Sequence, residues 1–262
     1  MKFNIISIFP EMFKALTESG VVGQAVKKKL VEIFTLSPRE FTEDFHKTVD
    51  DRPFGGGDGM VMLAEPLQKS FESLREKDQL GHVIYLTPQG APLTAKRVEE
   101  LSEMDVSVTL LCGRYSGVDE RILARYVDEE ISIGDFVVSG GELPAMMLID
   151  AVTRHVPGVL GHEDSAKKDS FHSGLLEAPQ FTRPREALGM PVPDEFLSGD
   201  HKKIDELRLK LSLVRTAIRR PDLIKEEDKK SLQNFAEELG TWDEILLSSC
   251  GLKKSELENL NV

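Results

Sequence analysis

Cysteine is scarce in this chain of 262 residues, which contains only Cys112 and Cys250. Two cysteines without metal-ligand spacing exclude a disulfide framework, and they fit a reducing compartment such as the cytoplasm. Long apolar runs are lacking too, because no stretch approaches the roughly 20 residues that a membrane helix needs. The first ten residues have too short and too polar a core for a signal peptide. We therefore expect a cytoplasmic protein that is not associated with a membrane.

Positive charge is in overall deficit, since the net charge is -12, and this balance by itself disfavours a nucleic-acid partner. The distribution of charge changes that expectation. Between positions 201 and 220, seven lysines and arginines outnumber two acidic residues, a local charge of +5. A basic face of this kind can bind phosphates on an acidic protein, with an affinity that depends on salt.

Apolar runs rich in β-branched residues alternate with helical patterns over the first 160 residues. A content of 40% apolar and 30% charged residues is typical of a folded globular chain rather than a disordered one. The alternation predicts an α/β fold with a parallel sheet that is covered on both faces. We expect strands at 3–9, 31–36, 83–87, 106–112 and 130–133, and helices at 11–16, 66–75, 94–104, 118–126 and 143–155.

The pattern changes after position 161. Residues 162–174 are polar and without periodicity, and prolines follow at positions 179, 184, 191 and 193. From about Lys203 the pattern is helical to the end of the chain. We interpret residues 1–160 as the parallel-sheet domain, 161–174 as a flexible linker, and 175–262 as a smaller, mainly helical domain.

One helix of the second domain has two distinct edges. Its apolar edge consists of Leu207, Leu211, Val214 and Ile218. A cationic edge lies beside it and consists of Arg208, Arg215 and Arg219, which lie within about 40° of one another at 100° per residue. This edge could follow RNA phosphates, although a solvated surface is the usual role of such a charge run.

Three strand-to-helix junctions with glycine occur within sixty residues, at 84–90, 111–120 and 131–144. In the last of them a short strand ends at Gly134, a tight turn follows at Gly140 and Gly141, and Pro144 stands in the first turn of a helix. Glycine lets the backbone approach a bound group closely, and amides at a helix start can hold a ligand. We expect the three loops to line one small-molecule pocket at the carboxyl ends of the strands.

Eight short motifs follow one another in a fixed order, at 48–60, 85–90, 112–115, 133–144, 157–162, 169–171, 182–184 and 197–199. This array resembles the bacterial tRNA (guanine-N1)-methyltransferases, the TrmD family of the SPOUT superfamily, from Phe3 to about Leu223. The resemblance implies a trefoil-knotted N-terminal domain, a homodimer, and transfer of a methyl group from S-adenosylmethionine. The implied target is N1 of guanosine 37 in the anticodon stem-loop of tRNA, with the C-terminal domain helping to hold the tRNA.

Guanine N1 carries a proton at neutral pH, so methylation needs a base at N1 and a stabilising group at O6, where negative charge develops. By resemblance Asp169, in the linker, is the base. Arg154 stabilises O6, and we expect it beside the pocket near the end of the 143–155 helix. The resemblance also gives Ser165 as a supporting contact to the tRNA.

The remaining site residues are also implied by the resemblance. Asp50 and Arg52, at the root of a glycine-rich loop, are expected to contact the tRNA, together with Arg208, Arg215 and Arg219. Methyl-donor contacts, mostly through main-chain groups, are expected from Leu86, Pro88, Gly113, Ile133, Gly134, Asp135, Phe136, Val137, Val138, Gly140 and Gly141.

Ser116 departs from the pattern, because relatives commonly carry glutamate there, and that glutamate has been tied to magnesium dependence. The serine puts a magnesium ion at this position in doubt, and we assign no metal ligand. Two alternatives stay open: another SPOUT enzyme, such as a ribose 2′-O-methyltransferase, and a non-catalytic tRNA-binding homologue. The pairing of Arg154 with Asp169 argues against the first, and the intact glycine loops argue against the second.

Overall fold

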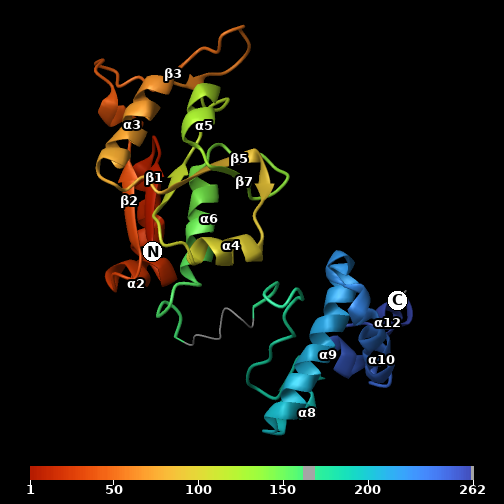
Figure 1. The fold of residues 1–262 in the computed structure, drawn as a ribbon. Coiled ribbons are helices and arrows are strands. Elements are labelled where there is room, and N and C mark those ends of the chain that lie inside the picture. Colours follow the sequence, from red (N-terminus) through yellow and green to blue (C-terminus); the bar gives the residue numbers. More distant parts are fainter. Residues whose placement is uncertain (162–168, 261–262) are drawn as a thin grey trace. The chain divides into compact units, whose positions relative to one another are not determined.

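The computed structural model describes residues 1–161 and 169–260. The internal contacts of the chain divide it into two units, Met1–Glu163 and Asp164–Val262, and each is described by itself (Figure 1). Among the helices in the described ranges, none combines the length and the apolar character needed to cross a membrane.

A five-stranded parallel sheet with the order β2-β1-β6-β5-β7 forms the centre of the first unit (Figure 1). The parallel sheet predicted from the sequence is therefore confirmed, and each predicted strand is present. The register between β5 and β7 is interrupted between Leu86 and Ala91, so β5 extends beyond its predicted end. The strands are β1 (Lys2–Ile6), β2 (Glu32–Leu36), β5 (His82–Pro92), β6 (Val108–Leu111) and β7 (Glu129–Ser132).

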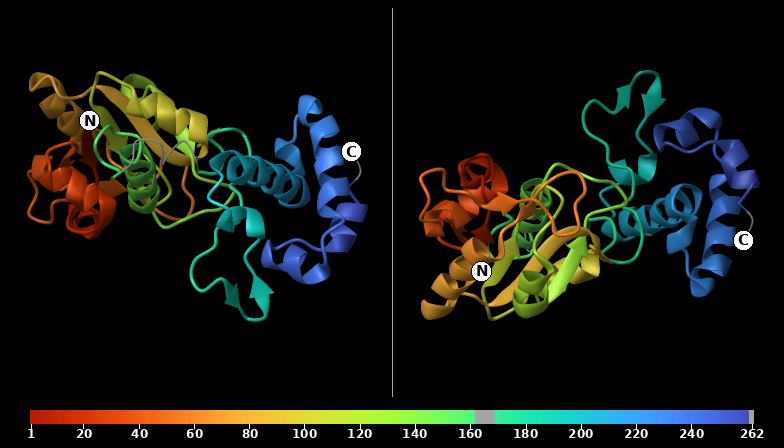
Figure 2. Two further views of the ribbon diagram at one scale, coloured as in Figure 1. Left: turned by 90° about the horizontal axis from the view of Figure 1, so that it is seen from below. Right: turned by 90° about the horizontal axis from the view of Figure 1, so that it is seen from above.

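Helices pack on both faces of this sheet, as Figure 2 shows in two further views. Helices α2, α4 and α6 contribute Val22, Val98 and Leu148 to the core on one face. On the other face α3 and α5 contribute Phe71 and Ile122. The helices are α1 (Lys14–Thr17), α2 (Gly20–Lys27), α3 (Ala64–Glu76), α4 (Ala95–Ser102), α5 (Glu120–Tyr126) and α6 (Glu142–Thr153), with 3-10 turns at Pro10–Phe13 and Pro38–Phe41.

Helix α2 was not expected from the sequence. Glycines and β-branched valines are poor helix formers, so local propensity argues against a helix at these positions. The helix forms because it buries Val22 and Ala25 against the sheet. Gly23 is needed there for space, since a Cβ atom at this position would lie 2.9 Å from the carbonyl carbon of Glu18. Tertiary packing thus overrides propensity.

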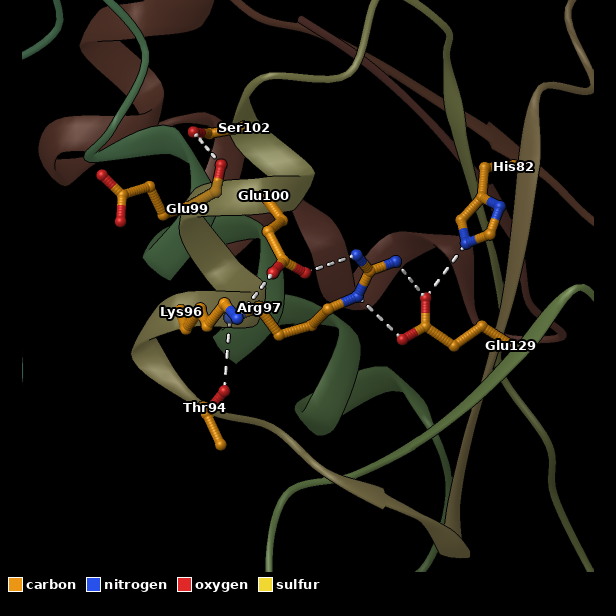
Figure 3. A network of polar contacts seen from close by, with 8 residues as sticks. All are labelled: His82, Thr94, Lys96, Arg97, Glu99, Glu100, Ser102 and Glu129. Atoms are coloured by element: carbon orange, nitrogen blue, oxygen red, sulfur yellow. Dashed lines mark hydrogen bonds and ion pairs between the residues drawn. The ribbon is translucent and has the colours of Figure 1, made fainter.

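Helix α4 is joined to the edge of the sheet by a polar network (Figure 3). Arg97 donates from Nε and Nη2 to the two carboxylate oxygens of Glu129 on β7, at 2.8 and 2.6 Å, and from Nη1 to Glu100 at 2.9 Å. His82 Nε2 lies 3.0 Å from the same Glu129 carboxylate. The carboxylate of Glu129 on β7 therefore binds side chains from both helix α4 and strand β5.

Between β2 and α3 the chain forms a small antiparallel hairpin of β3 (Asp50–Asp51) and β4 (Val61–Met62). The loop that joins these strands contains Gly55, Gly56, Gly57 and Gly59, all at positive φ. Such backbone angles favour glycine strongly, which accounts for the glycine run. Phe54 in this loop is fully exposed.

The second unit is mainly helical, and the helical pattern expected from about Lys203 is confirmed. Asp200 caps α9 by accepting from the backbone N–H groups of Lys202 and Lys203. The predicted apolar edge of α9 is buried at Leu207, Leu211 and Val214. The elements are β8 (Glu186–Ala187), β9 (Met190–Pro191), α8 (Asp194–Leu197), α9 (His201–Arg219), α10 (Lys229–Leu239), α11 (Glu244–Ser249) and α12 (Lys254–Glu258), with 3-10 turns at Pro221–Leu223 and Glu226–Asp228.

Candidate active site

A cavity of about 280 Å³ opens in the first unit at the carboxyl ends of β5, β6 and β7. The three glycine junctions singled out in the sequence all contribute to its wall. Asp135 belongs to the third junction, 131–144, but it is not among the residues that line the cavity. Ten of the eleven predicted donor-contact residues do line it: Leu86, Pro88, Gly113, Ile133, Gly134, Phe136, Val137, Val138, Gly140 and Gly141.

Glycine is required at two points where these loops meet other parts of the unit, because neighbouring atoms leave no room for a Cβ atom. A Cβ atom at Gly141 would lie 2.8 Å from the Cα atom of Cys112, and one at Gly113 would lie 2.8 Å from the Tyr85 hydroxyl. The Gly141 N–H donates to the Gly113 carbonyl at 2.9 Å and joins the two loops. Gly134 has a φ of +146°, which side-chain-bearing residues rarely adopt. At these glycines the cavity wall is formed by main chain.

A buried ion pair supports this wall from behind. Glu142, at the start of α6, is fully buried, and its carboxylate accepts from Arg114 Nε at 2.8 Å and from Ser7 Oγ at 2.7 Å. Arg114 also donates to the Ser139 carbonyl at 3.1 Å, and its guanidinium lies 4.7 Å from the centre of the Phe9 ring. The end of β1, the loop after β6 and the start of α6 are thereby held together.

The sequence analysis did not assign a role to Arg114 or Glu142. The signal in the sequence was the position of Glu142, a charged residue that directly follows two glycines at the start of a mostly apolar helix. Burial raises the pKa of the neighbouring Cys112 thiol well above its usual range, and the Glu142 carboxylate adds to that shift. Cys112 is consequently a neutral thiol, and it acts as a core residue.

A second, larger cavity of about 1080 Å³ adjoins the first, and Ser116, Gly117, Val118 and Glu120 line both. Of the predicted tRNA contacts, Arg52 lines this second cavity. Asp50 is half-buried in β3 and interacts with Tyr115, which lines the first cavity. Burial raises the pKa of Tyr115, and the Asp50 carboxylate raises it further. The structure therefore brings the 50–54 segment next to the glycine loops.

Ser116 lies between the two cavities, where its hydroxyl is 3.5 Å from the Asp58 carbonyl. A Cβ atom at Gly59 would clash with the Ser116 Oγ unless that hydroxyl moved, and the positive φ of Gly59 also favours glycine. Among the residues that the structure describes, no group of three or more histidine, cysteine, aspartate or glutamate side chains is arranged to hold a metal ion.

Arg154 follows the last residue of α6, whereas the cavity lies at the first turn of that helix, where Gly141 and Pro144 line it. Ten residues separate Pro144 from Arg154, which corresponds to about 15 Å along the helix axis. The expectation that Arg154 lies beside the pocket is therefore not met within one chain. Asp169 is half-buried and belongs to the second unit, and Ser165 lies outside the described residues.

The predicted cationic edge of α9 is only partly exposed. Arg208 and Arg219 are exposed, but Arg215 is half-buried, and its Nε atom is buried without a hydrogen-bond partner among the described residues. Burial lowers the pKa of Arg215, and the adjacent Arg219 charge lowers it further. Arg215 points toward Gly251, since a Cβ atom there would lie 3.7 Å from its Nη2. The cationic edge of α9 thus has two exposed charges rather than three.

Comparison with known proteins gives a consistent set of matches. The family model described as tRNA (Guanine-1)-methyltransferase TrmD matches residues 1–226. The curated tRNA (guanine-N(1)-)-methyltransferase of Ralstonia nicotianae is 50% identical over 241 residues, which cover 91% of this chain and 92% of that protein. The proteins of the same name from Shewanella sediminis and Hydrogenovibrio crunogenus are each 52% identical, over 90% and 85% of this chain and 100% and 94% of their own lengths.

Proposed function

The chain belongs to the tRNA (guanine-1)-methyltransferase TrmD family, and on this premise we propose that it transfers a methyl group from S-adenosylmethionine to N1 of guanosine 37 in tRNA. It is an enzyme of tRNA modification. Three points are proposed beyond the family assignment: S-adenosylmethionine is the methyl donor, guanosine 37 is the target, and the enzyme acts in the cytoplasm, where the tRNA would be.

The observation that carries the proposal is the cavity formed by three glycine-containing βα loops. Its wall combines glycine backbone with apolar and aromatic side chains such as Leu86, Phe136 and Val138, which suits the uncharged adenosine part of the donor. The close backbone crossing of Gly141 over Cys112 and Gly113 supports a threaded, knotted arrangement of these loops. S-adenosylmethionine, when bound, supplies an electrophilic methyl carbon.

The second cavity is proposed to receive the target nucleotide. It shares Ser116 and Glu120 with the donor cavity, so a guanine base placed in it can reach the methyl group. A base inside a stacked anticodon loop is not accessible at N1, and it must be turned out of the stack to react. Asp50 and Arg52, at the root of the exposed glycine loop, are proposed to contact this nucleotide and its 5′ neighbour, and the supporting observation is that Arg52 lines the second cavity.

Two side chains are assigned to the chemistry. Asp169 accepts the N1 proton of guanine, which frees the N1 lone pair to attack the methyl carbon. Arg154 stabilises the negative charge that develops on O6 as the proton leaves. Because a carboxylate is in general a weak base, this charge stabilisation is proposed to supply a large part of the rate enhancement.

We further propose that the active enzyme is a homodimer in which these residues act on the cavity of the partner. The supporting observation is that Arg154 lies at the opposite end of α6 from its own cavity, a separation that a rigid helix maintains. A second copy can supply the missing arginine. Mixing an Arg154→Ala chain with a chain disrupted in its donor cavity should then restore activity in the mixed dimer.

The function is tested by methylating a tRNA transcript and identifying the product nucleoside by mass spectrometry. With guanosine 37 present, 1-methylguanosine is expected. With adenosine at this position, no product is expected, because adenine lacks both the N1 proton and O6. Inosine retains both groups, so its methylation reports whether the 2-amino group is read. A 2′-O-methyl product, or no product from the guanosine transcript, contradicts the proposal.

A further inference from the structure

Glu120 lies where the two cavities of the first unit meet. Among the residues that the structure describes, four line both cavities, and only the last of them is charged: Ser116, Gly117, Val118 and Glu120. Glu120 is also the only acidic residue in the described lining of the donor cavity. The single basic residue of that lining, Arg114, is paired with the buried Glu142. The donor cavity therefore has one uncompensated negative charge, at its opening into the second cavity.

The Glu120 carboxylate is not occupied by another side chain. In the described part of the chain it forms no ion pair and accepts no hydrogen bond. Its two neighbours in the sequence differ in this respect, because Asp119 and Arg121 form an ion pair with each other at 2.7 Å. Glu120 is exposed, so a cationic ligand can approach it without displacing a partner.

The backbone that carries Glu120 is held by the neighbouring hairpin. The Met62 N–H on β4 donates to the Gly117 carbonyl at 3.0 Å, and the Asp119 N–H donates to the Met62 carbonyl at 3.3 Å. Asp119 also caps α5, which makes Glu120 the first residue of this helix, where the helix dipole favours a carboxylate. Support of the helix start is thus a structural alternative, and it does not depend on the charge of a bound ligand.

The negative charge of Glu120 acts on the wall of the donor cavity. Burial raises the pKa of Tyr85, which lines this cavity, and the Glu130 and Glu120 carboxylates raise it further. The same interaction that disfavours a second negative charge at this wall favours a positive charge.

The proposed reaction changes the charge of the donor at one atom. The sulfur of S-adenosylmethionine is a sulfonium cation. When the N1 lone pair of guanine bonds to the methyl carbon, the carbon–sulfur bond breaks and its electron pair stays on sulfur. The product S-adenosylhomocysteine is a neutral thioether at that atom, and the N1 proton passes to Asp169.

The position of the methyl group follows from the arrangement of the two cavities. A base in the second cavity can reach the methyl carbon only where the two cavities meet, and Glu120 lines both at that point. The sulfonium carries the methyl group, so it belongs at the same junction.

We infer that Glu120 distinguishes the methyl donor from its demethylated product by the charge on sulfur. This inference rests on the proposed function, because it takes S-adenosylmethionine as the donor. The carboxylate attracts the sulfonium before transfer, and afterwards the thioether has no charge for it to attract. Because Glu120 is exposed, solvent screens this attraction, and we expect a preference of about 3- to 5-fold in affinity at low salt.

The test compares the calorimetric dissociation constants of three ligands at low salt. These are S-adenosylmethionine, S-adenosylhomocysteine and sinefungin, an analogue with a cationic amine in place of the methylsulfonium. Glu120→Gln should weaken binding of the two cationic ligands by about 3- to 5-fold and that of S-adenosylhomocysteine by less than about 1.5-fold. Higher salt should reduce the difference between the variant and the wild type.

Two further variants serve as controls. Glu103→Gln removes the same charge from an exposed residue at the end of α4 that lines neither cavity, and it should leave all three affinities unchanged. Glu120→Asp keeps the charge on a shorter side chain and should retain most of the preference for the cationic ligands. A partly unfolded variant does not imitate the expected result, because it binds the neutral ligand less as well.

Equal weakening of all three ligands by Glu120→Gln overturns the inference, because Glu120 then supports the cavity wall or contacts the ammonium group that the ligands share. Unchanged affinities overturn it too, since the carboxylate is then only solvated. Both outcomes leave the proposed function intact. A wild-type enzyme that does not bind S-adenosylmethionine rejects the donor, and with it the proposed function itself.

Discussion

At the scale of single residues, Glu142 shows how a charge can organise a site without entering the chemistry. Its carboxylate has no exposed surface and accepts hydrogen bonds from Arg114 and Ser7, which come from two other segments. It also lies in the first turn of α6, where the helix dipole favours a negative charge. Removal of the charge would leave Arg114 without its partner in a mostly buried environment.

We expect Glu142→Gln to lower the free energy of unfolding by about 3 kcal/mol, since breaking a buried ion pair leaves an uncompensated charge. The loops that line the donor cavity should loosen as well and weaken donor binding. Urea unfolding and calorimetry measure the two effects. Ser7→Ala removes one neutral donor to the same carboxylate and should cost only about 1 kcal/mol. Equal losses in the two variants would contradict a special role for the ion pair.

Asp169 is the residue on which the proposed chemistry depends most directly. Asp169→Ala should reduce methyl transfer by at least about 100-fold, the usual contribution of a general base. Donor affinity should be unchanged, because Asp169 belongs to the second unit and the donor cavity to the first. Single-turnover methylation and calorimetry are the measurements. Asp105→Ala, at an exposed aspartate before β6, is the control, and unchanged turnover in Asp169→Ala would remove this residue from the mechanism.

At the scale of elements, the contact between α4 and the sheet edge depends on one shared carboxylate (Figure 3). Burial alone would raise the pKa of Glu129, but hydrogen bonds from Arg97 and His82 outweigh it, and the pKa of Glu129 lies below its ordinary value of 4.5. A carboxylate with a lowered pKa stabilises the folded state above its unfolded pKa. That stabilisation is lost as the pH falls through the lower, folded value.

Arg97→Ala should therefore destabilise the protein by about 2 kcal/mol at neutral pH, the range for hydrogen bonds to a charged group. The difference from wild type should begin to shrink below about pH 4.5 and vanish as the pH falls through the lowered folded-state pKa of Glu129, where the carboxylate is protonated in both proteins. Denaturant unfolding at several pH values measures it. Lys96→Ala on the same helix removes an 86% exposed cation and should change stability by less than about 0.5 kcal/mol. A pH-independent effect of Arg97→Ala would exclude the carboxylate as its origin.

At the scale of the whole molecule, the two units have separate hydrophobic cores. The two clusters of the first unit draw their buried residues from positions up to Val152, and the cluster of the second unit begins at Ala178. A unit with its own core can fold by itself. The donor cavity is built wholly within the first unit, whereas Asp169 belongs to the second.

A fragment that ends at residue 161 should therefore fold cooperatively and bind S-adenosylmethionine, but it should not methylate tRNA. Thermal unfolding, calorimetry and a methylation assay test the three statements. The full-length protein is the reference for each measurement. A fragment without a cooperative transition would mean that the first unit depends on the second for its stability.

Much of the fold could be predicted because periodicity depends on near neighbours. The five strands and the helices around them follow from alternating and 3.6-residue patterns that each segment carries by itself. Helix α2 was missed because its glycines and valines disfavour a helix, and its burial against the sheet is not visible locally. The glycine loops were found because a tight turn or a close backbone approach requires glycine at that position.

Short-range sequence properties thus specified the strands, the parallel sheet, the glycine junctions and the change of character after residue 161. Only the folded chain decided which side chains meet. It paired Arg114 with a glutamate 28 positions away, turned Arg215 toward Gly251, and gathered Arg183, Arg185 and Arg208 around one hollow. The physical reason is that local propensity acts over a few residues, whereas ion pairs and cavities depend on which distant segments the topology brings into contact.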